Sequence, residues 1–299
     1  MGKIITAVFL TFSLLFAAMP AQARPVELKH GELTLLGNLE LAEGKTLADG
    51  VLLMVHGTLG HHGMETIKSL QKNLKARGVN TLAVTLSLGI DRRKGAFDCN
   101  QPMRHRHEDA LEEIAAWIDW LKNEGAGDIW LFGHSRGGNQ AALYMARKKD
   151  PRVKRLVLLA PMTYKATRAA AKYKERFGVP LAPVLRQATN MTRAGKQGFM
   201  EVPGILYCKD ARATPESFLS YHRPSRHYDT PTVLPMVQVP VLVLAGAEDE
   251  LFPDLLPAMR PLAKEVHIEL KVIADADHFF RDFASEDAAD AIAAWLKGA

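Results

Sequence analysis

One serine of this chain lies in a setting that suits nucleophilic attack on a carbonyl carbon. Residues 133–137 read Gly-His-Ser-Arg-Gly, which places Ser135 at the centre of a Gly-x-Ser-x-Gly pattern. An apolar run at 128–132 precedes the pattern, and a run typical of a helix follows it. This arrangement predicts a sharp strand-to-helix turn that projects the serine hydroxyl from the top of a sheet. The two glycines avoid the clashes that larger side chains would make in such a turn.

A serine hydroxyl is a weak nucleophile at neutral pH, so it needs a base, and the base needs an acid to orient it. His278 is the predicted base, because it follows the last strand-like run and precedes the last helix. Asp249 is the predicted acid, because it follows the apolar run at 241–245 in a Gly-x-x-Asp sequence. The alternatives for the acid are Glu248, Glu250 and Asp254, each of which could instead be a charge at a helix N-terminus.

Two backbone N–H groups should stabilise the oxyanion that forms during attack. One is predicted to come from Arg136, and the other from Thr58 in the glycine-rich loop 56–63, with Leu59 as the alternative. The histidines of this loop could suggest a metal site, but no carboxylate or cysteine stands beside them at ligand spacing. We therefore expect no metal.

The elements that must position these residues alternate between apolar runs and helical periodicity. Strands buried on both faces are predicted by continuous apolar runs at 51–55, 81–86, 128–132, 153–160, 241–245 and 266–273. Helices are predicted at 64–77, 104–122, 163–177 and 286–297, the last capped by Ser285. Such alternation implies parallel pairing with right-handed crossovers. Two short alternating stretches at 25–29 and 32–39 predict an antiparallel pair at the edge.

The segment 161–239 is too long for a single crossover helix, so it predicts a cap inserted over the site. After its first helix, many prolines indicate short broken elements. The segment is rich in basic residues: Lys165, Arg168, Lys172, Lys174, Arg176, Arg186, Arg193, Lys196, Lys209, Arg212, Arg223 and Arg226. As a group they indicate an anionic or carboxylate-bearing substrate, although any one of them could belong to a solvated helix face.

The start of the chain predicts export. Lys3, the apolar run 4–18 and Ala-Gln-Ala at 21–23 are typical of a secretory signal peptide over 1–23, which leaves a mature domain of 24–299. The alternative is an uncleaved membrane anchor, which the short apolar core disfavours. Because no later run is apolar enough to span a bilayer, we expect a secreted or periplasmic protein with no stable membrane anchor.

The composition is that of a globular domain, with 47% apolar residues and a formal net charge of +5. No DNA- or RNA-binding motif accompanies this mild basic excess, so no nucleic-acid partner is expected. The two cysteines, Cys99 and Cys208, are predicted to pair in an oxidising compartment and to tie the loop after the second core strand to the cap. Two unpaired thiols are the alternative.

The whole constellation resembles the α/β-hydrolase superfamily, in particular its esterase, lipase and acyl-hydrolase members. The resemblance extends from His56-Gly57 through Ser135 and Asp249 to His278. It implies an eight-stranded, mostly parallel α/β sheet flanked by helices, with a cap after the sixth strand. It also implies acyl transfer to serine without a cofactor, with Ser135, Asp249 and His278 as the triad and Thr58 and Arg136 at the oxyanion hole. Arg136 departs from the small or apolar residue usual at its position, and would place a cation at the edge of the pocket.

The function predicted from these residues is hydrolysis of carboxylic esters, with a small-molecule ester or acyl compound as substrate. A thioesterase, amidase or peptidase would use the same triad, and the superfamily hosts many substrates. From other classes, the chain could be a non-catalytic binding protein on a hydrolase scaffold, or its cap could bind an anionic membrane surface or an acidic partner.

Overall fold

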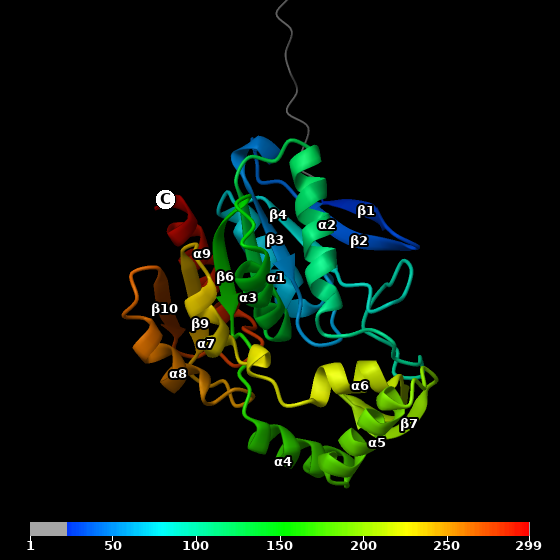
Figure 1. Ribbon diagram of the computed structural model, residues 1–299. Helices are drawn as coiled ribbons and strands as arrows, with labels where there is room; N and C mark the ends of the chain where they lie inside the picture. The colour runs from blue at the N-terminus through cyan, green and yellow to red at the C-terminus, as the bar shows by residue number, and fades with distance from the viewer. Residues whose placement is uncertain (1–22, 299) are drawn as a thin grey trace, which may run out of the picture.

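The fold is a single mostly parallel sheet with helices on both faces and a cap at one end (Figure 1). The computed structural model describes residues 23–298, so the predicted signal peptide 1–23 lies outside the described residues except for Ala23. The strands of the sheet, in chain order, are β1 (Arg24–His30), β2 (Leu33–Glu40), β3 (Val51–Val55), β4 (Thr81–Thr85), β5 (Ile129–His134), β6 (Val153–Leu159), β9 (Val241–Gly246) and β10 (Ile268–Ile273). Their spatial order is β1-β2-β4-β3-β5-β6-β9-β10. The pairs β1–β2 and β2–β4 are antiparallel, so of these eight strands β2 alone runs in the opposite direction.

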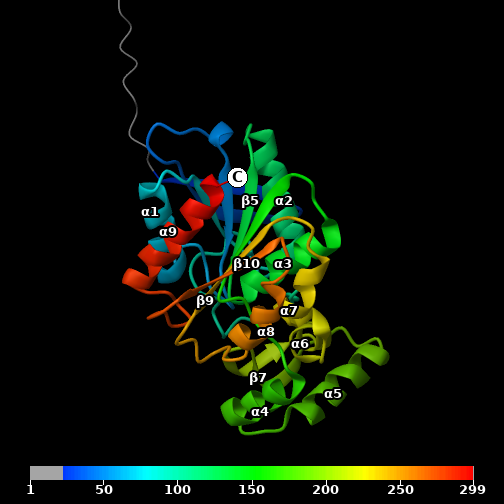
Figure 2. The ribbon, with the colours of Figure 1, turned by 90° about the vertical axis from the view of Figure 1, so that its left-hand side faces the viewer.

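Helices cover both faces of the sheet, which explains why its inner strands are continuously apolar. The helices against the sheet are α1 (Glu65–Ala76), α2 (Asp109–Asn123), α3 (Arg136–Lys148), α7 (Thr230–Val233), α8 (Leu255–Leu262) and α9 (Phe283–Lys297). Helices α1 and α9 lie on one side of the sheet, and α2 and α3 on the other (Figure 2). Alternate residues of β3 face these two layers: Leu53 packs in the cluster of α2 and α3, whereas Leu52 and Met54 pack in that of α1 and α9. Full burial of each such side chain contributes about 1.5–3 kcal/mol relative to exposure.

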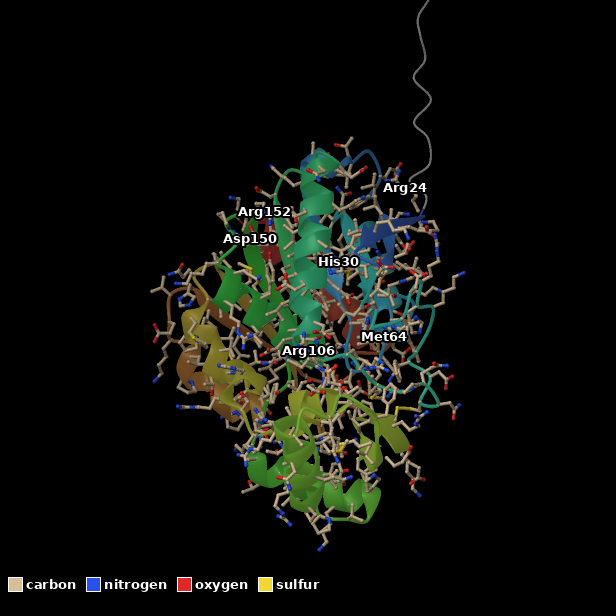
Figure 3. All side chains as sticks on the ribbon, turned by 45° about the vertical axis from the view of Figure 1, so that its right-hand side comes forward. Arg24, His30, Met64, Arg106, Asp150 and Arg152 are labelled. Atoms are coloured by element: carbon tan, nitrogen blue, oxygen red, sulfur yellow. A yellow bond between two sulfur atoms is a disulfide. The ribbon has the colours of Figure 1, made fainter. Side chains whose placement is uncertain are left out.

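The carboxyl ends of the parallel strands lie together at one end of the sheet, next to the cap. The loops after β3, β5, β9 and β10 therefore lie together, although they are far apart in sequence. The opposite edge carries a charged pair instead: Asp150 and Arg152 lie side by side between α3 and β6 (Figure 3), with an Nε–Oδ1 distance of 2.8 Å. That pair stabilises a turn remote from the loops that carry the predicted site.

The cap has its own apolar core and is inserted after β6. Its elements are α4 (Ala166–Phe177), α5 (Leu181–Arg193), β7 (Met200–Ile205), β8 (Cys208–Ala213) and α6 (Pro215–His222). Phe218 of α6 and Ile205 of β7 lie fully buried at its centre. The end of the predicted insert behaves differently, because Val233 and Leu234 pack in the main core beneath the sheet.

The prediction of short broken elements after the first cap helix is confirmed for 226–236, where three helical turns of three or four residues follow one another, and is wrong for 181–213. The structure has a 13-residue helix, α5, followed by the β7–β8 hairpin. Pro183 does not break α5, because it lies in the first turn, where a backbone N–H has no intrahelical acceptor.

Three predicted helix starts are also wrong. Helix α4 begins at Ala166 rather than 163. Helix α2 begins at Asp109 rather than 104, because the preceding segment is held extended against the cap: the Met103 amide donates to the Arg212 carbonyl at 2.8 Å. Helix α9 begins at Phe283, so Ser285 lies inside it and does not cap it. The Ser285 hydroxyl instead accepts a hydrogen bond from Asn73 of α1 at 3.1 Å.

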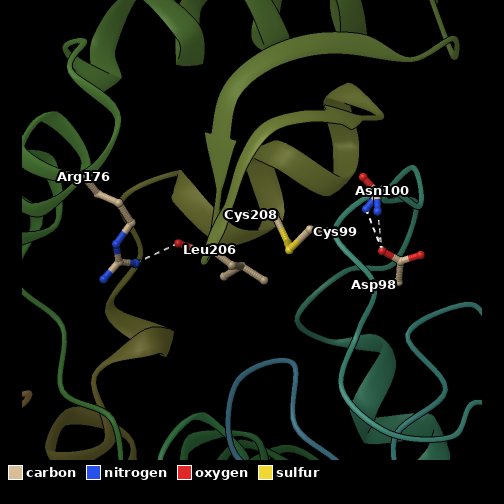
Figure 4. The surroundings of a disulfide bond; sticks show 6 residues. All are labelled: Asp98, Cys99, Asn100, Arg176, Leu206 and Cys208. Carbon is tan, nitrogen blue, oxygen red and sulfur yellow. Dashed lines mark hydrogen bonds between the residues drawn. A yellow bond between two sulfur atoms is a disulfide. The ribbon is translucent and has the colours of Figure 1, made fainter.

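Cys99 and Cys208 form a disulfide with a Cα–Cα distance of 5.2 Å (Figure 4), as the cysteine count favoured. Cys99 lies in the loop after β4, and Cys208 is the first residue of β8. The bond therefore ties the cap to a loop of the sheet domain. Among residues 23–298, no helix has the length and apolar character needed to cross a bilayer.

Candidate active site

Ser135 occupies a strained turn between β5 and α3. Its backbone has φ 56° and ψ −121°, a region that non-glycine residues rarely adopt. The flanking glycines are required by close backbone contacts: a Cβ at Gly133 would lie 2.3 Å from the Gly137 carbonyl oxygen, and one at Gly137 would lie 2.3 Å from that of His56. The Gly-x-Ser-x-Gly spacing therefore has a steric cause in this fold.

The side chains of Ser135, His278 and Asp249 form one hydrogen-bonded chain. His278 Nε2 lies 2.9 Å from Ser135 Oγ, and His278 Nδ1 lies 2.8 Å from Asp249 Oδ2. All three residues are buried, with exposed fractions of 6%, 4% and 8% for Ser135, His278 and Asp249. Because Nδ1–H donates to the carboxylate, Nε2 is left as the acceptor for the serine proton.

Asp249 is held ionised at the end of this chain. Burial acts to raise the pKa of Asp249, but the hydrogen bond and charge of His278 and two backbone amides outweigh it and hold the pKa below its usual value. The amides are those of Leu251 and Phe252, which donate to Oδ1 at 2.9 and 3.1 Å.

The alternative acids do not reach His278. Glu248 and Glu250 are exposed. Asp254 accepts hydrogen bonds from Arg168 and from the Thr163 hydroxyl, so it links the cap to the sheet domain.

The acid loop and the base loop approach each other at Gly246. A Cβ there would lie 2.3 Å from the Ala276 carbonyl oxygen, and that oxygen accepts a hydrogen bond from the Glu248 amide at 3.0 Å. Glycine at this position therefore allows the loops after β9 and β10 to pack close enough for Asp249 to reach His278.

The amides predicted to form the oxyanion hole lie on two adjacent loops. Thr58 follows β3 and Arg136 follows Ser135, and the loops touch at Gly57, where a Cβ would lie 3.2 Å from Ser135 Cβ. Neither the Thr58 nor the Arg136 amide donates a hydrogen bond within the part of the chain that the structure describes. The alternative residue, Leu59, packs its side chain against the core of the cap.

The Arg136 side chain joins these two loops. Its Nε donates to Thr58 Oγ1 at 3.1 Å, and its Nη1 donates to His107 Nδ1 at 3.3 Å. His107 presents Nδ1 as an acceptor because its Nε2–H donates to Asn139 Oδ1 at 2.9 Å, while the Asn139 amide nitrogen donates to the His227 carbonyl. Burial and the Arg136 charge lower the pKa of His107 well below its usual value, which keeps the ring neutral.

Sequence reasoning missed His107 and Asn139, and no local motif marks either residue. The part that each plays near the site is recognisable only from its hydrogen bonds to residues distant in sequence. The side chain of Arg136 carried a signal, since its type was unusual for its position, but its contact with Thr58 could not be inferred.

Two histidines of the loop 56–63 hold it against β4 and the residue that follows this strand. His56 Nε2 accepts from the Leu86 amide at 3.1 Å, and burial together with Arg93 lowers the pKa of His56 to about 3. His62 Nδ1 lies 2.7 Å from Thr85 Oγ1. Within residues 23–298, no three His, Cys, Asp or Glu side chains are arranged to hold a metal ion.

His134, next to the nucleophile, does not reach the serine hydroxyl. Its Nε2–H donates to the His278 carbonyl oxygen at 3.0 Å, and the two rings lie 5.1 Å apart. Burial and the neighbouring His278 lower the pKa of His134 to about 3, so it remains neutral and helps to fix the backbone of His278.

A pocket between the cap and the sheet domain opens beside these residues. Its wall includes Thr58, Arg136 and Phe252, and the Phe252 ring packs edge-on against His278 with centroids 5.2 Å apart. Tyrosines contributed mostly by the cap form much of the remaining wall: Tyr164, Tyr173, Tyr207, Tyr221 and Tyr228. The space in this open pocket, about 170 Å³, is close to the volume of a cavity of about 150 Å³ known to hold benzene, so it suits one ring or a short chain.

The sequence matches the profile of the Alpha/beta hydrolase family over residues 52–295, most of the chain. The chain belongs to this family. The match spans every loop of the site described above, from Thr58 to His278. Comparison of this hydrolase with curated proteins gives no significant match.

Solved structures share the fold of this hydrolase at low sequence identity. Est1E from Butyrivibrio proteoclasticus with ferulic acid bound is 19% identical, with a TM-score of 0.66 over 91% of this chain and 98% of that one. An esterase from Pyrococcus furiosus, PF2001, is 17% identical, with a TM-score of 0.62 over 99% and 98% of the two chains. A dienelactone hydrolase from Anabaena variabilis is 18% identical, with a TM-score of 0.55 over 94% and 99%. At these identities the likeness shows a common architecture.

Proposed function

We propose that this protein is a serine hydrolase that cleaves carboxylic esters of small molecules, and that it acts as a secreted or periplasmic protein. The observation that carries the proposal is the pair of contacts made by one buried imidazole, at 2.9 Å to the Ser135 hydroxyl and 2.8 Å to the Asp249 carboxylate. Esterases among the proteins of similar fold, one of them with ferulic acid bound, favour an ester over a thioester or amide.

The proposed reaction proceeds in two halves. Ser135 Oγ attacks the ester carbonyl while His278 Nε2 takes its proton, and Asp249 stabilises the resulting imidazolium. The Thr58 and Arg136 amides donate to the oxyanion of the tetrahedral intermediate. His278 then returns the proton to the departing alcohol, which leaves an acyl group on Ser135. Water then takes the place of the alcohol and attacks the acyl carbonyl while His278 Nε2 takes its proton. The bond from the carbonyl carbon to Ser135 Oγ breaks, His278 returns the proton to Ser135, and the acid is released.

Export is supported by the predicted signal peptide 1–23 and by the Cys99–Cys208 disulfide, a bond that persists mainly in oxidising compartments. N-terminal sequencing of the protein from periplasmic or culture fractions should find Arg24 at or near the start. An intact Met1 in membrane fractions would contradict this part of the proposal.

Replacement of Ser135 by alanine tests the chemistry. We expect Ser135→Ala to lower turnover of a p-nitrophenyl ester by at least about 10⁴-fold and to abolish labelling by a fluorophosphonate, with an unchanged circular dichroism spectrum. Ser225→Ala is the matched control, because that hydroxyl lies at the edge of the cap and, within residues 23–298, accepts a hydrogen bond from the His227 amide alone. Wild-type protein that resists the fluorophosphonate would instead indicate a binding protein on a hydrolase scaffold. Thioester and amide analogues of the same acyl group measure the preference for esters.

A further inference from the structure

The pocket beside the proposed nucleophile is lined by cations and by no carboxylate. Five basic side chains contribute to its wall: Arg136, Lys165, Arg168, Lys172 and Arg176. The other eight basic residues noted in the cap segment do not line it. The positive charge of the cap therefore divides into a solvated surface and a smaller group that faces this pocket.

Only two of the five pocket cations are paired with an acid inside the described chain. Lys165 and Arg168 both contact the carboxylate of Asp254. Lys172 donates to the Leu251 carbonyl at 3.2 Å, and Arg176 donates to the Leu206 carbonyl at 2.8 Å (Figure 4). These two, together with Arg136, form no ion pair with an acid of residues 23–298, so their charge is available to a ligand.

Arg136 is the most constrained of the three. Its guanidinium is partly buried against the Tyr221 ring, 5.4 Å from the centroid, and its described hydrogen-bond partners, Thr58 and His107, are neutral. Its Nη2 has no partner among the described residues. Removing a cation from water without an opposing charge is unfavourable. An unpaired cation in such a place is expected where a bound anion supplies the opposing charge.

We propose that the substrate carries a carboxylate close to its scissile ester and that the Arg136 guanidinium binds this carboxylate. The inference rests on the proposed function, because it concerns the substrate of the same site. Arg136 directly follows the nucleophile and is hydrogen-bonded to Thr58, so an anion bound to its free Nη2 lies near the reacting carbonyl. Lys172 and Arg176 add positive charge on the cap side of the pocket. The tyrosines of the wall accommodate a ring or a short chain between Arg136 and these two cations.

Pairs of esters that differ only in charge test the proposal. Mono-p-nitrophenyl esters of succinate, glutarate and adipate are compared with p-nitrophenyl butyrate, valerate and hexanoate, in which a methyl group replaces the carboxylate. We expect the wild-type protein to favour at least one anionic ester by about 10- to 100-fold in kcat/KM, the range that hydrogen bonds to charged groups supply. A wild-type ratio at or below one for every chain length would overturn the inference, while turnover of the neutral esters and fluorophosphonate labelling would leave the proposed function intact.

Variants locate the anion-binding group. Arg136→Met should lower the anionic-to-neutral ratio of kcat/KM by about 10-fold or more. Arg136→Lys should lower it by less, because lysine keeps the charge but cannot donate the two parallel hydrogen bonds of a guanidinium. Arg260→Gln, on the exposed side of α8 and outside the pocket, controls for the loss of one positive charge. Fluorophosphonate labelling shows that each variant is folded. An unchanged ratio in a labelled Arg136→Met protein overturns the role of Arg136, and if that variant does not fold, Arg136→Lys and the wild-type ratio still decide.

Discussion

The loops at the carboxyl ends of the strands and the cap above them are held by different interactions. Backbone contacts that only glycine permits fix these loops, and short hydrogen bonds join three buried polar side chains within them. The cap has a small apolar core of its own and is anchored to the sheet domain by one disulfide, by the ion pairs of Asp254, and by hydrogen bonds. Under the proposed function, this difference means that the reaction chemistry depends on the sheet, whereas the choice of substrate depends on the cap and on the side chain of Arg136.

The largest effect is expected from the loss of the buried negative charge of Asp249. Asp249→Asn should lower kcat for a p-nitrophenyl ester by about 10⁴-fold, because the neutral amide favours the wrong tautomer of His278 and cannot stabilise its protonated form. Glu250→Gln is the matched control, since this neighbouring carboxylate is exposed, and it should leave kcat unchanged. An Asp249→Asn protein with nearly normal kcat would mean that another acid orients His278.

The corresponding test of the cap is removal of its covalent anchor. The double variant Cys99→Ser, Cys208→Ser should lose about 2–4 kcal/mol of unfolding free energy in urea, because the bond closes a long loop, with residues 109 apart in sequence. Fluorophosphonate labelling should persist, while KM rises. A dithiothreitol-treated wild type should match the variant. Loss of labelling in the folded variant would break the comparison, because the reaction chemistry would then depend on the cap.

A buried carboxyl hydrogen-bonded to the loop after β4 should make the sheet domain sensitive to pH. Burial raises the pKa of Glu113 to about 7, although its hydrogen bonds from Ser87 act in the opposite direction. A folded pKa above the unfolded one means that its stabilising effect is complete below about pH 4.5 and is lost as the pH rises toward 7. We expect the free energy of unfolding in urea to fall by up to about 3 kcal/mol over that interval. Glu113→Gln should remove this difference, and an unaltered pH profile in the variant would contradict the assignment.

The smallest effect is expected from the loss of the hydrogen bond between Arg136 and Thr58. Thr58→Val keeps the backbone amide but removes the hydroxyl that accepts from Arg136 Nε. We expect kcat to fall about 3- to 10-fold for charged and neutral esters alike, with little change in KM, because the loop loses one hydrogen bond to a charged group. Thr58→Ser should restore kcat. A change in KM alone would instead place Thr58 in substrate binding.

The fold class and family membership were predictable from the sequence because their signals are local. Apolar runs mark strands buried on both faces, and the predicted strands agree with the structure to within one or two residues. Helix starts were less predictable, since α2 and α9 begin where contacts with other elements allow. The folding of the cap was misjudged at Pro183, because a proline in a first helical turn and a proline that breaks a helix look alike without the flanking geometry.

The sequence by itself determined the residues whose roles depend on neighbouring chain atoms: the serine between two glycines, and the acid and histidine placed just after strands. Steric contacts at Gly133 and Gly137 act over a few residues, so they leave a pattern that can be read along the chain. Only the tertiary structure decided which side chains meet across long sequence separations, such as Arg136 with Thr58 and His107, or Asp254 with Arg168. These contacts depend on the packing of whole elements, which no short pattern encodes. For that reason the sequence indicated a basic cap and a cation at Arg136, and only the tertiary structure decided which basic side chains line the pocket.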